Sequence, residues 1–192
     1  MAESPVGEPL KTPVLVITGP SGVGKGTLIK GLLERVPGLQ LAVSATTRPP
    51  RDTEVNGRDY HFLSPEEFEA RVRAGEFVEH AEYADNRYGT LRSELDRPAT
   101  VIVLEIDVQG ARQVRETLPR AVRVFIEPPS FEVLQARLAG RASDSPEQIE
   151  RRLAAARDEL AARDEFTYRV VNDDLARALH ELAQLAATMS SP

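Results

Sequence analysis

The chain has 192 residues, of which 41% are hydrophobic and 28% are charged, as expected for one globular domain. Cysteine is absent, which excludes disulfide bonds, thiol catalysis and cysteine-ligated metal sites. A net charge of −6 disfavours nucleic-acid binding, and no apolar run reaches the ~18 residues of a membrane-spanning helix. The first residues lack the basic-then-apolar pattern of a secretory signal, so we expect a cytoplasmic protein.

The first third of the chain alternates between strand and helix patterns. Residues 1–12 are polar and contain proline, and they are predicted to form a flexible tail. Residues 14–17 (VLVI) are a β-branched, apolar run typical of a strand buried on both faces. A glycine-rich segment follows, then a helix that Pro37-Gly38 ends, and then a second strand over residues 39–44.

The segment from residue 46 to residue 92 has a different composition, with few apolar runs and many Arg, Asp, Glu and Tyr residues. Ser64-Pro65-Glu66-Glu67 is a capping box with proline at the first helical position, and Gly75 is expected to end that helix. Residues 77–83 alternate like a strand, and Asp85-Asn86 is predicted to be a turn.

The second half returns to alternating strands and helices. The predicted strands cover residues 101–104, 121–127 and 168–171. The predicted helices open at Gln109-Gly110, span residues 131–138, run from the capping box at 145–148 to about Arg163, and run from Asp173 or Asp174 to about Ala187. This alternation predicts an α/β fold with a parallel sheet flanked by helices.

The glycine-rich segment carries the first functional signal. It reads Gly19, Pro20, Ser21, Gly22, Val23, Gly24, Lys25, Gly26 and Thr27, and it joins a buried strand to a helix, as a P-loop does. Its glycines allow the backbone N–H groups to turn inward around phosphate oxygens, at the positive end of the following helix. The segment therefore predicts an ATP site in which Lys25 reaches the β- and γ-phosphates.

One position departs from the P-loop pattern. Gly26 stands where Ser or Thr usually follows the lysine, so the hydroxyl that normally contacts Mg²⁺ is missing. Thr27 either replaces that hydroxyl or only caps the helix. Asp107 ends a buried strand about 80 residues later, where a carboxylate either holds Mg²⁺ or caps the next helix.

Further segments resemble the guanylate kinases. They are residues 44–51 (SATTRPPR), 54–60 (EVNGRDY), 86–90 (NRYGT), 105–110 (EIDVQG) and 171–174 (VNDD). The resemblance runs from about Val14 to Leu175. It implies a P-loop NTPase fold with a GMP-binding insertion and a helical lid in one domain over residues 13–185. The core would cover 13–45, 93–136 and 158–187, the GMP-binding part 46–92 and the lid 137–157.

The resemblance also implies a GMP pocket. Arg48 and Arg51 can face one phosphate, to which Tyr60 and Tyr88 can donate hydroxyls, and by resemblance these four hold the phosphate of GMP. Glu79 occupies the position of the family's guanine acceptor, where a carboxylate accepts from N1–H and N2–H₂ and would repel adenine. Ser44 and Thr90 match positions that contact guanine O6. Glu105, where the family often has Asp, and Asp107 complete the predicted set.

Arginines in the second half are implied to line the lid. Arg137 and Arg141 are four residues apart and share a helical face, and Arg152 lies on the next helix. The resemblance predicts that they stabilise the negative charge that develops on the transferring phosphoryl group. It further predicts that Asn172 contacts the adenine of ATP.

The expected activity is therefore transfer of the γ-phosphoryl of MgATP to GMP, which gives ADP and GDP. The expected partners are these small molecules and Mg²⁺, with neither nucleic acid nor membrane. Two alternatives are a guanylate-kinase-like scaffold without activity and a P-loop kinase for a different phosphate acceptor. The intact Gly22, Gly24 and Lys25 argue against the first alternative, and Glu79 with its two hydroxyl neighbours argues against the second.

Overall fold

The structure is a computed structural model that describes residues 12–83, 85–140 and 146–190. Its larger sheet is parallel and has five strands in the order β2-β7-β1-β8-β9. These strands are β1 (Val14–Thr18), β2 (Leu39–Leu41), β7 (Val101–Glu105), β8 (Val122–Glu127) and β9 (Tyr168–Val171). Because all five run in one direction, their carboxyl ends meet at a single edge, where ligands of such folds bind.

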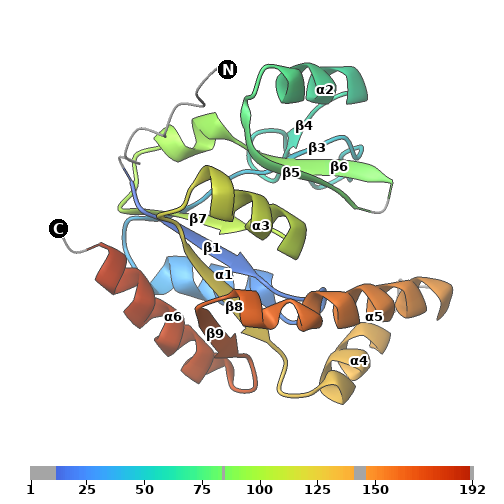
Figure 1. Ribbon diagram of the computed structural model, residues 1–192, viewed down its shortest axis with the longest axis vertical. Helices are drawn as coiled ribbons and strands as arrows, with labels where there is room; N and C mark the ends of the chain where they lie inside the picture. The colour runs from blue at the N-terminus through green and yellow to red at the C-terminus, as the bar shows by residue number, and fades with distance from the viewer. Residues whose placement is uncertain (1–11, 84, 141–145, 191–192) are drawn as a thin grey trace.

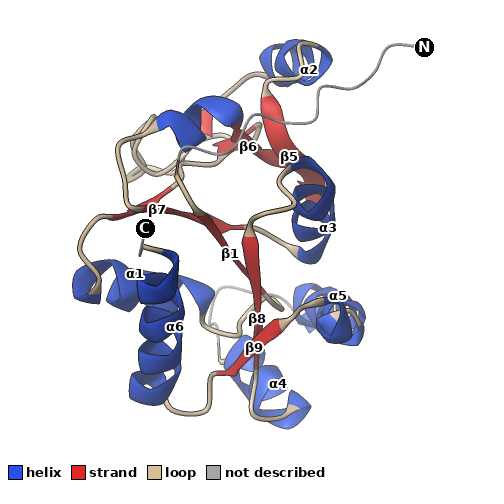
Figure 2. Ribbon diagram, turned by 60° about the vertical axis from the view of Figure 1, so that its left-hand side comes forward, coloured by secondary structure: helices blue, strands red, loops and turns tan. Residues whose placement is uncertain are grey.

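Helices cover both faces of this sheet (Figure 2). They are α1 (Lys25–Arg35), α3 (Val108–Thr117), α4 (Phe131–Ala139), α5 (Pro146–Ala161) and α6 (Leu175–Met189). Leu15 and Ile17 of β1 belong to a core cluster with α1, α4, α5 and α6, whereas Val14 and Val16 pack toward α3. β1 is fully buried as a result, and its packed carboxyl end holds the start of the glycine-rich segment in place.

A second, smaller sheet with strand order β4-β3-β6-β5 lies apart from the first (Figure 1). Its strands are β3 (Ala45–Thr46), β4 (His61–Phe62), β5 (Phe77–Tyr83) and β6 (Asn86–Leu91), and helix α2 (Pro65–Arg73) packs on it. A short 3-10 helix, Arg92–Asp96, leads back to β7. The predicted capping box at Ser64 is confirmed, since the side chains of Ser64 and Glu67 each accept from the other residue's backbone N–H.

The α/β fold with a parallel, helix-flanked sheet is confirmed, but two local predictions are only partly correct. The strand expected over residues 39–44 ends at Leu41, and the next strand, β3, begins at Ala45 and belongs to the other sheet. Asp85 is in the predicted turn, with a φ of 63°, whereas Asn86 already begins β6, which pairs with β5 from Tyr83–Asn86 onward. The polar, glycine-containing sequence of β6 gives no strand signal, and its pairing partners supply the stabilisation that propensity does not.

Candidate active site

The glycine-rich segment forms the loop between β1 and α1, with Lys25 as the first helical residue. Gly19, Gly22 and Gly24 have φ angles of 141°, 82° and 101°, a region that other residues rarely adopt. A Cβ on Gly19 would also lie 2.4 Å from the carbonyl oxygen of Ile126 on the neighbouring strand. Backbone conformation and the approach of β8 therefore both require glycine at the start of this loop.

Two residues that are predicted to contact the nucleotide, Asn172 and Arg137, form hydrogen bonds to the glycine-rich loop. The buried Asn172 donates its amide N–H to the carbonyl of Val23 at 2.8 Å. Arg137 donates to the same carbonyl at 3.2 Å and to the carbonyl of Asn172 at 3.1 Å. With the carbonyl of Val23 held this way, these residues fix the loop conformation. The contacts predicted for Asn172 with adenine and for Arg137 with phosphate stay predictions.

Two charged side chains lie against the same loop. The ammonium group of Lys25 donates to the carbonyls of Gly19 at 2.5 Å and Pro20 at 3.3 Å. Glu159 of α5 accepts a hydrogen bond of 3.3 Å from the backbone N–H of Ser21. Sequence reasoning missed Glu159, because one glutamate in a charged helix looks solvated until the tertiary fold is known.

Carboxylates gather around Lys25 at the carboxyl edge of the parallel sheet. Burial raises the pKa of Glu105, which ends β7, and the charge of Lys25 opposes this rise. Burial likewise raises the pKa of Glu159, where Lys25 and the Ser21 N–H oppose the rise and the charge of Asp107 adds to it. Glu105 and Glu159 thus lie on either side of the loop: Glu105 is paired with Ile17 of β1, just before the loop, and Glu159 contacts Ser21 within it.

The two candidate metal ligands differ in their surroundings. Asp107 precedes α3 and accepts from the backbone N–H of Gly110 at 2.8 Å, so it is an N-cap whatever else it does. Thr27 is exposed on the first turn of α1. A Cβ on Gly26 would meet no atom within 4 Å, so there is room here for the Ser or Thr side chain that usually follows the P-loop lysine.

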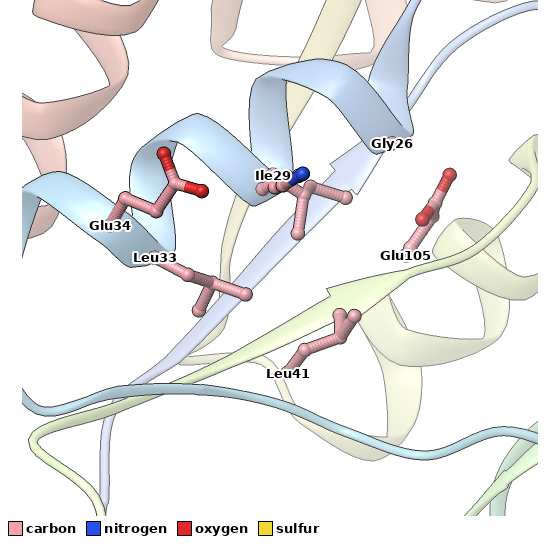
Figure 3. A pocket seen from close by; sticks show the side chains of 7 residues that line it. Gly26, Ile29, Leu33, Glu34, Leu41 and Glu105 are labelled. Carbon is pink, nitrogen blue, oxygen red and sulfur yellow. The ribbon is translucent and has the colours of Figure 1, made fainter. Parts of the chain in front are cut away.

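Gly26 borders a cavity of about 400 Å³ between α1 and the neighbouring strand ends (Figure 3). Ile29, Leu33 and Leu41 form its apolar wall, and Glu105 lies at the end nearest the P-loop. The cavity thus continues the phosphate-binding region outward along α1.

The predicted guanine acceptor, Glu79, is on β5 and is only 4% exposed. The hydroxyl of Thr90 on β6 donates to its Oε1 atom at 2.7 Å. Burial raises the pKa of Glu79 to about 7, the Thr90 hydrogen bond opposes this rise, and the charge of Asp107 adds to it. A Cβ on Gly110 would lie 2.5 Å from Oε2, so α3 approaches this carboxylate closely because residue 110 is glycine.

The predicted phosphate pocket for GMP is partly assembled. The guanidinium of Arg48 lies 5.4 Å from the ring centre of Tyr60, which lies 6.2 Å from that of Tyr88. Arg48 donates to both oxygens of Glu54, at 2.8 and 2.9 Å. This hydrogen bond is the main cause of the raised pKa of Arg48, and burial raises the pKa of Tyr60.

Other predicted residues lie at the margins of these pockets. Arg51 is exposed, and its backbone N–H donates to Glu54 at 2.8 Å. Ser44 lies between β2 and β3, where its carbonyl accepts from the N–H of His61. Arg152 is half-buried on α5, and Arg141 lies outside the described residues. Glu54 was also missed as a site residue, although its place in the resembling segment 54–60 was a usable signal.

Glu79 of the small sheet and Asp107, which follows β7 of the large sheet, meet at Gly110. Asp107 accepts from the N–H of Gly110 at 2.8 Å, and a Cβ on Gly110 would lie 2.5 Å from Oε2 of Glu79. Asp107 acts on Glu79 on one side and on Glu159 on the other. The small sheet therefore places Glu79 beside the residues that follow β7, at the same edge of the parallel sheet as the P-loop.

A phosphate-binding loop at the carboxyl edge of a parallel sheet, facing a polar pocket on an inserted sheet, defines a P-loop kinase. The family model for guanylate kinase matches residues 11–189, and the chain belongs to this family. It is an enzyme of the nucleoside monophosphate kinase class.

Named relatives agree over most of the chain. A guanylate kinase of Gloeobacter violaceus is 54% identical over 187 residues, which cover 96% of this chain and 91% of that protein. One from Rubrobacter xylanophilus is 51% identical and covers 90% of this chain and 92% of that protein. The crystal structure of guanylate kinase from Anaplasma phagocytophilum superposes with a TM-score of 0.73 at 30% identity, covering 94% and 87%.

A more distant structure shares the fold alone. Shikimate kinase from Bacteroides thetaiotaomicron matches with a TM-score of 0.55 at 14% identity, covering 91% of this chain and 98% of that one. Among the described residues, no helix is long and apolar enough to cross a membrane.

Proposed function

We propose that this guanylate kinase binds MgATP on the P-loop and GMP on the small sheet, and transfers the γ-phosphoryl directly to the GMP phosphate. The observation that carries the assignment is the buried Glu79, held by Thr90 in a region shared with Lys25 and Asp107. Among the described residues Glu79 forms no ion pair, so a ligand that donates to this buried carboxylate would stabilise its charge, and the guanine edge offers two adjacent donors.

The ATP half of the site uses the backbone more than side chains. Loop N–H groups and the amino terminus of α1 hold the phosphates, and Lys25 adds a point charge. Lys25 would exchange its hydrogen bonds to the carbonyls of Gly19 and Pro20 for phosphate oxygens. Arg137 and Asn172 keep the carbonyl of Val23 turned toward themselves and away from the anion.

The GMP half uses side chains from the inserted sheet. Ionised Glu79 accepts from N1–H and N2–H₂ of guanine. Ser44 would donate to O6, and Thr90 would do so by exchanging its hydrogen bond to Glu79. Arg48, Arg51, Tyr60 and Tyr88 hold the phosphate, for which Arg48 exchanges its pairing with Glu54. Because adenine presents an acceptor at N1, the pocket disfavours AMP.

Mg²⁺ fits this site as an ion held mainly by phosphates and water. None of the described residues forms a group of three or more His, Asp or Glu ligands suited to a metal. Mg²⁺ bound with ATP needs only one or two protein carboxylates, so Asp107 with Thr27 is a compatible donor set. When bound, the ion would neutralise charge on the phosphates.

The residues then act by position and charge. The two pockets set the GMP phosphate in line with the γ-phosphoryl group, and Arg137, Arg141 and Arg152 offset charge as it is transferred. Closure of the inserted sheet and the lid excludes water, which would otherwise accept the phosphoryl group.

The test is a substrate panel. ATP and Mg²⁺ are supplied with GMP, AMP, shikimate or no acceptor, and ADP and the phosphorylated product are measured. We expect GDP formation with GMP and at least ~100-fold lower kcat/KM with AMP. Folded protein that binds GMP without forming GDP would support the scaffold alternative. Preference for another acceptor would overturn the guanine assignment.

A further inference from the structure

The proposed reaction assigns no role to Glu159, although this carboxylate contacts the glycine-rich loop. It is near the carboxyl end of α5, and its Oε2 atom accepts the backbone N–H of Ser21 at 3.3 Å. Ser21 is the third residue of the glycine-rich loop, so its N–H belongs to the group of donors that would hold phosphate oxygens.

The surroundings of Glu159 are those of an anion site. The carboxylate is half-buried, and burial raises its pKa, whereas the charge of Lys25 and the hydrogen bond from the Ser21 N–H oppose this rise and favour the ionised form. A carboxylate that accepts a loop N–H beside the loop lysine makes the contacts that a phosphate oxygen would make. It therefore holds a donor that the nucleotide needs, and its charge repels the nucleotide.

The position of Glu159 on its helix connects this contact to the lid. Glu159 follows Arg152 by seven residues, or about two helical turns, so both lie on the same face of α5 roughly 10 Å apart. In Figure 1, α5 (orange) extends as one continuous helix from beside β8 outward past α4. The same helix thus presents an anion to the P-loop and carries a predicted phosphate-binding arginine.

We propose that Glu159 is a positioning residue that competes with the ATP phosphates for the Ser21 N–H and thereby sets the affinity of the P-loop for nucleotide. The inference rests on the proposed function, because it requires that the P-loop holds the ATP phosphates. A phosphate oxygen that takes the Ser21 N–H displaces the carboxylate and releases this contact between α5 and the loop.

The experiment separates charge from structure with two substitutions. Glu159→Gln keeps the size and the acceptor oxygen but removes the charge, and Glu159→Ala removes both. Asp158→Asn is the matched control, since Asp158 is exposed on the same helix, lies outside the predicted lid and loses the same charge. Inorganic pyrophosphate without Mg²⁺ serves as the calorimetric probe, and KM for ATP and kcat are measured with GMP saturating.

We expect Glu159→Gln to bind pyrophosphate roughly threefold to tenfold more tightly and to lower KM for ATP by a similar factor, with a smaller change in kcat. Glu159→Ala should change both in the same direction, and Asp158→Asn should match the unsubstituted enzyme. Thermal unfolding of each variant shows that the comparison is between folded proteins.

Other results would overturn the inference. Unchanged or weaker pyrophosphate binding in Glu159→Gln would mean that the carboxylate does not compete with phosphate. Weaker binding of MgATP together with tighter binding of pyrophosphate would assign Glu159 to the metal instead. If the unsubstituted enzyme binds no pyrophosphate, or if Lys25→Ala does not weaken that binding, the P-loop assignment itself fails.

Discussion

The P-loop and the proposed GMP pocket both hold a phosphate, but the P-loop uses backbone donors and the GMP pocket uses side-chain donors. The P-loop is one continuous segment whose donors are backbone N–H groups, fixed by glycines at positive φ and by the carbonyl anchor at Val23. The GMP pocket takes side chains from several strands and connections of the small sheet, and Arg48 is paired with Glu54. Backbone donors cannot be substituted away one by one, whereas side-chain donors can be.

The largest expected effect is at the P-loop. Lys25→Ala should lower turnover by roughly 1,000-fold or more, because a charge aimed at the transferring phosphoryl group is lost. Steady-state kinetics measure the loss. Arg35→Ala, which removes an exposed cation from the last turn of the same helix, is the control and should leave kcat unchanged.

Base selection should be the next largest effect. Glu79→Gln should lower kcat/KM for GMP by about 100-fold, since an amide cannot accept from both guanine donors without presenting its own N–H₂ to one of them. KM for ATP should stay within about twofold of the value for the unsubstituted enzyme, because Glu79 contacts only the GMP half of the site. Equal losses for both substrates would show instead that the substitution disturbs the whole site.

The raised pKa of Glu79 predicts a pH dependence. Only the ionised carboxylate accepts both guanine donors, and with a pKa of about 7 in the free enzyme it is mostly neutral at pH 6 and mostly ionised at pH 8. GMP should therefore bind about tenfold more tightly at pH 8 than at pH 6. Titration calorimetry of Glu79→Gln corrects for the GMP phosphate, which titrates in both proteins. A flat difference between the two proteins would remove Glu79 from the site.

The raised pKa of Glu79 also affects the free energy of unfolding. This effect has the opposite pH dependence to GMP binding, because the contribution of Glu79 to stability falls as the pH rises. The folded pKa of Glu79 lies above that of an unfolded glutamate, so the folded protein binds the extra proton. Stability from this group is complete below the unfolded pKa and is lost as pH rises from about 4.5 through about 7. In Glu79→Gln, chemical denaturation should show a weaker decline of the free energy of unfolding over that range.

The smallest effect is expected at Gly26. Gly26→Ala should stabilise the protein by a few tenths of a kcal/mol, since the position is helical and a Cβ there meets no atom within 4 Å. Gly19→Ala is the contrasting variant and should destabilise by about 1–3 kcal/mol, because of its φ of 141° and the 2.4 Å approach to Ile126. Urea denaturation measures both. Similar effects at the two positions would contradict the account of the loop.

The sequence by itself determined the features that depend on neighbours along the chain. The buried strands, the capping box at Ser64 and the phosphate loop with Lys25 are encoded in short runs whose physics is local. The resemblance to guanylate kinases added the residues of the predicted GMP pocket. The separate motifs by themselves do not show how these residues lie relative to one another.

Only the tertiary structure decided which distant groups meet. It divided residues 39–46 between two sheets and paired β6 with β5 against its own weak propensity. It also brought Glu159 to Ser21 across 138 residues and Glu79 close to Asp107. Such contacts depend on how helices and strands pack around the carboxyl edge of the sheet, and neither propensity nor spacing within a segment carries that information.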